Sequence, residues 1–129
     1  MITYGIQKEI TGDFLAILAK VKIELAKEGF GILTEINVSE TLKKKLNIDY
    51  PHYVILGTCN PHSAYAALQV EKEIGLLLPC NVILYENDGK IMVAAIRPII
   101  AMQIIDNSRV AEIAKEVEKK LKKVITLLR

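Results

Sequence analysis

The chain has 129 residues, of which 51% are hydrophobic and none is tryptophan. Its 17 Lys and Arg residues against 15 Asp and Glu residues give a net charge of +2, without the clustered basic excess that phosphate-backbone binding requires. These values predict one domain over residues 1–129 with an aliphatic core, and they argue against two ordinary domains and against a nucleic-acid partner.

The N-terminal stretch lacks the charged and apolar regions of a secretory signal. The longest apolar run, at 91–105, is interrupted by Arg97 and Pro98 and is shorter than the ~18 uncharged residues typical of a membrane span. We therefore expect a cytoplasmic protein with no membrane segment. That compartment is reducing, so two free thiols are expected in preference to a disulfide.

The first elements in chain order are a strand over residues 2–10 and a helix that runs to about Glu28. Asp13 precedes the first apolar turn and is the predicted N-cap, because its carboxylate can accept a backbone N–H. Gly29 supplies the left-handed residue that ends the helix, and Phe30 is placed to contact its last turn.

Residues 30–38 alternate in polarity and predict a second strand in which Glu35 points away from the main core. A short helix follows over 39–47, with Leu42 and Leu46 expected to point inward and its three lysines toward solvent.

A third strand is predicted over 52–59, and Asn60 and Pro61 follow it as N-cap and first residue of a helix over roughly 61–71. A fourth strand, 80–86, and a fifth, 90–97, are joined by the hairpin signal Glu86-Asn87-Asp88-Gly89. Asn107 or Ser108 begins the last helix, which carries one apolar stripe.

This order of elements predicts an α+β two-layer sandwich, with the two long helices on one face of a mostly antiparallel sheet. The central strands are apolar at both parities, so either choice of inner face leaves the other face exposed. The two alternating sets are Val54, Leu56, Ile83, Val93 and Ala95, and Ile55, Val82, Leu84, Met92, Ala94 and Ile96. We therefore predict a homodimer whose interface is the helix-free sheet face, residues 98–105, or both.

Four stretches resemble the family named "domain of unknown function 302", a group of small bacterial and archaeal proteins. They are EGFGILTEINVSETLKKKL (28–46), YVILGTCNPHSAYAAL (53–68), IGLLLPCNVILYENDG (74–89) and Arg97-Pro98. The resemblance implies a β-α-β4-α fold related to the TATA-binding-protein fold and a dimeric state, and it supplies no reaction or ligand. Carried across by position, the family pattern points to Glu35, Lys45, Cys59, Asn60, Pro61, Cys80 and Asn81 as candidate ligand-binding residues.

The chain's only cysteines each precede an asparagine, as Cys59-Asn60 and Cys80-Asn81. The spacing of the cysteines and histidines matches no usual zinc pattern, so no metal is expected. A disulfide, a reactive Cys59 thiolate ahead of a helix N-terminus, and two small buried side chains at strand ends all remain open.

The favoured hypothesis is a dimeric binding module that holds a small polar or anionic ligand near these pairs, with Glu35 and Lys45 contributing charge. The alternatives are a thiol-dependent redox or transfer enzyme that uses Cys59 and Cys80, and a purely structural or interaction domain. No catalytic or nucleotide-binding motif is present, and no cofactor is implied.

Overall fold

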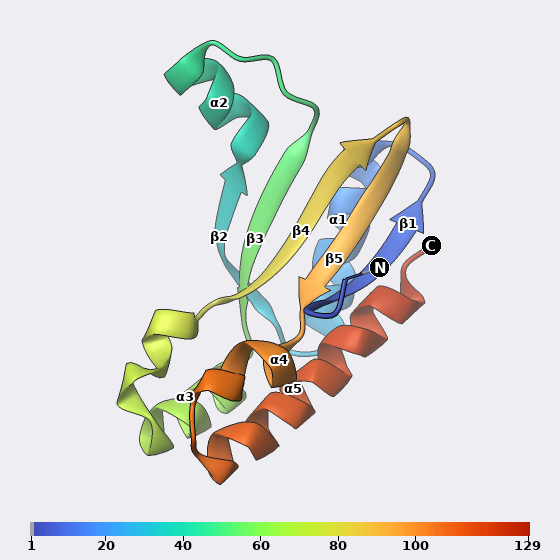
Figure 1. Cartoon of the computed structure of the whole chain (residues 1–129). Helices are drawn as coiled ribbons and strands as arrows, with labels where there is room; N and C mark the ends of the chain where they lie inside the picture. The colour runs from blue at the N-terminus through green and yellow to red at the C-terminus, as the bar shows by residue number, and fades with distance from the viewer. Residues whose placement is uncertain (1) are drawn as a thin grey trace.

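The computed structural model describes residues 2–129 as one antiparallel sheet with helices packed against it (Figure 1). The strands are β1 (Gly5–Ile10), β2 (Gly31–Asn37), β3 (Tyr53–Cys59), β4 (Cys80–Asn87) and β5 (Lys90–Ile96). The helices are α1 (Phe14–Lys27), α2 (Val38–Leu46), α3 (Pro61–Val70), α4 (Pro98–Ala101) and α5 (Ser108–Leu127), with short 3-10 helices η1 (Lys72–Leu77) and η2 (Met102–Ile104). The spatial order β1-β5-β4-β3-β2 confirms the predicted α+β sandwich.

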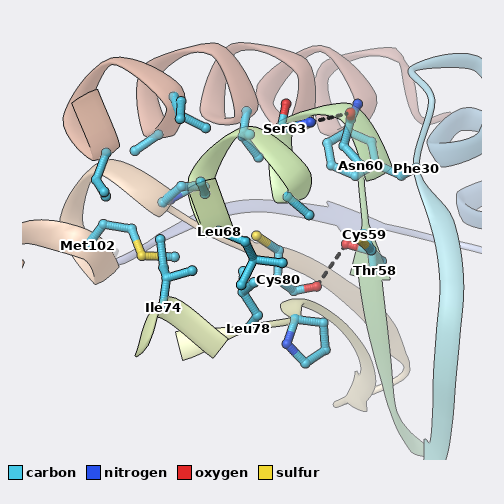
Figure 2. A pocket seen from close by; sticks show the side chains of 18 of the residues that line it. Phe30, Thr58, Cys59, Asn60, Ser63, Leu68, Ile74, Leu78, Cys80 and Met102 are labelled. Atoms are coloured by element: carbon cyan, nitrogen blue, oxygen red, sulfur yellow. Dashed lines mark hydrogen bonds between the residues drawn. The ribbon is translucent and has the colours of Figure 1, made fainter. Parts of the chain in front are cut away.

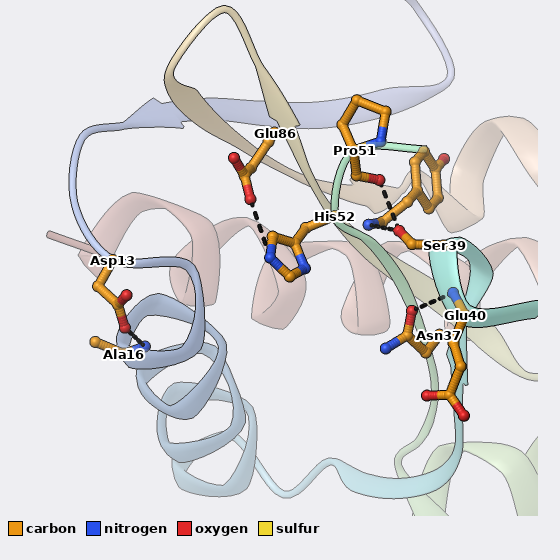
Figure 3. A network of polar contacts seen from close by, with 9 residues as sticks. Asp13, Ala16, Asn37, Ser39, Glu40, Pro51, His52 and Glu86 are labelled. Carbon is orange, nitrogen blue, oxygen red and sulfur yellow. Dashed lines mark hydrogen bonds and ion pairs between the residues drawn. The ribbon is translucent and has the colours of Figure 1, made fainter. Parts of the chain in front are cut away.

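Local capping signals in the sequence position the first helix as predicted. The Asp13 carboxylate accepts the Ala16 N–H at 3.0 Å at the start of α1 (Figure 3). At the other end Gly29 has φ +84°, and the Phe30 N–H donates to the Leu25 carbonyl at 3.0 Å. This 6→1 bond is the Schellman stop that the glycine indicated.

The core lies between the sheet and the two long helices, α1 and α5. Val21 and Leu25 of α1 and Leu121 of α5 are fully buried in one cluster with Leu56 and Leu84 of the sheet. These helices thereby cover one face of the sheet, and Figure 1 shows α1 behind the strands and α5 along the lower right of the molecule.

The strand pairing corrects the predicted grouping of side chains on the sheet. Leu84 is opposite Val54 and Val82 is opposite Leu56, so Val82 and Leu84 point into the core. Ile83 instead joins the residues on the helix-free face. The predicted grouping was wrong by one residue in β4, because polarity cannot fix the register of a strand that is apolar at both parities.

A bulge in β2 corrects the expected position of Glu35. The pairing shifts between Ile32 and Thr34, so that Ile32 is opposite Thr58 and Glu35 is opposite Leu56, on the helix side of the sheet. Glu35 therefore does not point away from the core layer; its carboxylate reaches Lys22 of α1, with Nζ–Oε1 at 2.6 Å. The extra residue of the bulge reverses the parity of the residues after it.

The short helix α2 differs from the prediction in its packing. It contains no buried residue, and Leu46, which was expected to point inward, is 62% exposed. Its start is fixed by polar contacts: Asn37 Oδ1 accepts the Glu40 N–H at 3.0 Å, and the Ser39 hydroxyl donates to the Pro51 carbonyl at 2.6 Å (Figure 3). The helix α2 therefore extends from the sheet without burying an apolar face.

Residues 98–105 fold back onto the body as α4 and η2. Pro98 and Met102 are buried, whereas Ile104 is 78% exposed. Among residues 2–129, no helix combines the length and the apolar character needed to cross a membrane.

Candidate functional site

A cavity of about 300 Å³, called here the main cavity, lies where the end of β3 and the start of β4 meet α3 and α5 (Figure 2). Ala64 and Ala67 of α3 and Ala114 of α5 line it. Short side chains at these helix positions leave space that longer ones would fill. Figure 2 shows Ser63 and Asn60 toward one end of the cavity and Ile74 and Met102 toward the other.

The wall of the main cavity is almost entirely apolar. Among the described residues that line it, none carries a charge, and the polar side chains are Thr58, Asn60 and Ser63 together with the thiols of Cys59 and Cys80. The cavity therefore offers apolar contact along its length and polar atoms chiefly at the end where α3 begins.

Two of these polar side chains already have partners within the fold. The Thr58 hydroxyl, fully buried, donates to the Cys80 carbonyl at 2.8 Å and joins the end of β3 to the start of β4. Asn60 Oδ1 accepts the Ser63 N–H at 3.3 Å, which confirms the predicted N-cap of α3. Asn60 Nδ2 also donates to the Glu28 carbonyl at 3.3 Å, a bond to the end of α1 that the sequence did not indicate.

The two cysteines are free thiols in the structure, each partly buried. Cys80 is opposite Thr58 in the sheet and lines the main cavity. Burial, with a smaller contribution from the nearby Cys59, raises the pKa of the Cys80 thiol to about 11. Cys80 is therefore a protonated, weakly polar group near neutral pH.

Asn81 and Pro61 lie beside the main cavity. Asn81 is opposite Gly57 and exposed, and it lines a second space of about 290 Å³, called here the side hollow. Pro61 is the exposed first residue of α3 and follows the Asn60 cap.

The two charged candidates lie elsewhere. Glu35 lies on β2 and pairs with Lys22 of α1, and Lys45 is exposed in the last turn of α2. Neither Glu35 nor Lys45 lines the main cavity or the side hollow. Within the part of the chain that the structure describes, no three His, Cys, Asp or Glu side chains gather closely enough to hold a metal ion. The structure thus brings Cys59, Asn60 and Cys80 together and leaves the charged pair outside.

Several lining residues were not anticipated as part of a site. Ile74 and Leu78 come from η1 and the segment after it, and Met102 comes from η2. The only sequence signal was their occurrence in the apolar runs IGLLLP and PIIAMQII, which no predicted element accounted for.

A partly buried ion pair holds the segment that carries Met102 against α5. Glu118 of α5 accepts from Arg97 Nε and from the Ile99 N–H, both at 3.1 Å. Arg97 Nη1 also donates to the Thr3 carbonyl at 3.0 Å. The Arg97-Pro98 motif therefore fixes α4 against α5 and holds Pro98 at the cavity.

Comparison with known proteins gives a family without an activity. A search of curated proteins finds no match. The chain is similar in structure to an uncharacterized conserved DUF302 protein from Bacillus stearothermophilus, whose crystal structure matches with a TM-score of 0.92 and 26% identity over 99% of this chain and 100% of that one. The profile of DUF302, a domain of unknown function, matches residues 6–128, and the chain belongs to this family.

Proposed function

We propose that this protein binds a small neutral molecule with a mostly apolar body in the main cavity. The observation that carries the proposal is a space of about 300 Å³ whose wall is apolar and has a few polar atoms at one end. Ligand pockets typically measure ~300–1,000 Å³ and combine apolar walls with a few polar groups that orient the ligand. The Ser63 hydroxyl and the two thiols can supply that orientation.

The absence of charge among the described lining residues favours a neutral ligand over an anionic one. Transfer of an unpaired carboxylate or phosphate from water into an apolar space costs several kcal/mol or more. The sequence suggested that Lys45 could supply the counter-charge, but Lys45 lies on α2 and does not line this cavity. At the start of α3, one backbone N–H that could bind an anion is already in use, because Asn60 Oδ1 accepts the Ser63 N–H.

The thiol-enzyme alternative has less support than binding. A resolving cysteine must lose its proton to attack a disulfide. With a pKa of about 11, Cys80 would be ionised in only about one molecule in ten thousand at pH 7.

The test is binding of a neutral fluorescent dye, N-phenyl-1-naphthylamine, followed by displacement with neutral and anionic compounds. Ala64→Phe fills the main cavity and should abolish dye binding, whereas His62→Phe adds the same ring at an exposed position of α3 and should not. A displacing compound at 100 times its Kd should also stabilise the fold by ~2.7 kcal/mol. Equal dye binding by both variants would contradict the proposal and favour a purely structural domain.

A homodimer is part of the proposed function, and the helix-free sheet face supports it. Ile55, Ile83 and Met92 are partly exposed on this face, and Tyr53 stacks on Tyr85 with ring centroids 5.3 Å apart. Because side chains alternate along strands, these residues point away from α1 and α5, which cover the other face of the sheet. A second copy that meets this face about a two-fold axis would cover both patches at once.

Light scattering tests the dimer with two matched variants. Ile83→Asp places a charge on the helix-free face and should convert dimer to monomer, whereas Ile23→Asp makes the same change on the exposed side of α1 and should leave the dimer intact. A wild-type monomer at micromolar concentration would contradict the proposal.

A further inference from the structure

The main cavity and the side hollow are neighbours that share one wall. Five residues line both spaces: Leu78, Pro79, Cys80, Pro98 and Met102. The side hollow has a volume of about 290 Å³, similar to that of the main cavity, and it extends toward Asn81 and Ala101. Only this layer of side chains and backbone separates them.

Met102 is the part of the wall best suited to move. Two of the other four residues are prolines, whose rings hold the backbone fixed, and Cys80 is paired in the sheet opposite Thr58. Methionine is unbranched, has three rotatable side-chain bonds and adapts to irregular space. Figure 2 shows the Met102 side chain at the end of the main cavity away from Ser63.

The side hollow repeats the chemistry of the main cavity. Among the described residues that line it, none is charged, and its polar side chains are Cys80 and Asn81. Leu76, which lines only this space, is 84% exposed and extends the apolar surface at its mouth. An apolar path therefore leads from the Ser63 end past Met102 to an exposed amide.

We infer that the two spaces are halves of one site, joined by rotation of Met102, and that the ligand is an elongated neutral aliphatic molecule with a hydroxyl or amide end. This inference rests on the proposed function of the main cavity and identifies the class of its ligand. The chain of such a molecule occupies the apolar path, and its polar end meets Ser63 or Asn81. A compact molecule of the same polarity would fill the main cavity alone.

A chain-length series tests this inference. The affinities of hexanol, octanol, decanol and dodecanol are measured by displacement of N-phenyl-1-naphthylamine from the wild type and from Ala101→Phe. Ala101 lines the side hollow but not the main cavity, so its replacement by phenylalanine obstructs only the second half. Gln103→Phe is the matched control, because Gln103 is exposed nearby and lines neither space.

In the wild type and in Gln103→Phe, affinity should rise about fourfold per added methylene through the longest alcohol, the gain expected for burying each group. In Ala101→Phe the short alcohols should bind normally, and the rise should stop at an intermediate length. A plateau at the same length in all three proteins, or no plateau in Ala101→Phe, would overturn the joined site while leaving the main cavity as a binding site. Failure of the dye and of every alcohol to bind the wild type would overturn the proposed function together with this inference.

Discussion

The two Cys-Asn pairs look alike in the sequence and have different roles in the structure. Asn60 is buried and joins two helices, since it caps α3 and donates to the carbonyl of Glu28, the residue that follows α1. Asn81 is exposed on the helix-free side of β4, opposite Gly57. The difference comes from the residue after each pair, because Pro61 begins a helix whereas Val82 continues a strand. A repeated dipeptide therefore indicates two strand ends, but not two equivalent site residues.

The largest expected effect comes from Asn60. Asn60→Ala should lower the free energy of unfolding by about 2 kcal/mol, because it removes a helix cap and the hydrogen bond to the Glu28 carbonyl. Asn60→Ser keeps a capping oxygen and should recover about half of this loss. Urea unfolding measures both, and a loss below a few tenths for Asn60→Ala would show that the two helices are not joined through this side chain.

The Cys80 thiol should make stability depend on alkaline pH. Burial raises its pKa from 9.0 to about 11, so the folded protein keeps a proton that the unfolded chain releases. The stabilisation is therefore full below pH 9 and declines as the pH rises through 11, by about 1 kcal/mol over the first unit above 9. Cys80→Ala should lack this decline. If the free energy of unfolding fell equally with pH in the wild type and in Cys80→Ala between pH 9 and 11, the prediction would be contradicted.

A smaller effect is expected at Asn81. Asn81→Ala shortens an exposed side chain on the sheet surface. Such substitutions change stability little, so the free energy of unfolding should change by less than ~0.5 kcal/mol. Urea unfolding beside Asn60→Ala makes the contrast direct. Equal losses for the two asparagines would mean that the pairs are equivalent after all.

No effect is expected from a reducing agent. Both cysteines are free thiols, so the wild-type Tm should be the same with and without reductant. A bridge between residues 59 and 80 would instead contribute on the order of 3 kcal/mol. A Tm that falls when reductant is added would show that the two pairs are covalently joined in solution.

The features that sequence predicted correctly are those determined by neighbouring residues. The caps at Asp13 and Asn60 and the stop at Gly29 each depend on a side chain and the few residues beside it. The Asp88-Gly89 turn is of the same kind, since both residues have positive φ, 52° and 76°.

The features that sequence missed depend on contacts between distant segments. The bulge after Ile32 reversed the side of Glu35, and the apolar run of β4 concealed which of Val82 and Ile83 points inward. Leu46 has the spacing of a buried residue, but no element of the described chain lies over it. At the candidate site, the cysteines were identified, whereas Met102 was not, because only the fold brings η2 to the start of β4.

The uncharged wall of the main cavity also determines how binding should respond to ionic strength. A ligand recognised through ion pairs loses affinity as salt screens the charges. Here no charged side chain among the described residues faces the ligand, so added sodium chloride should change the affinity little. Sulfate and phosphate salts, which strengthen the burial of apolar surface, should raise it. The protein would then retain its ligand in a concentrated electrolyte, where proteins that bind ligands through surface charge release them.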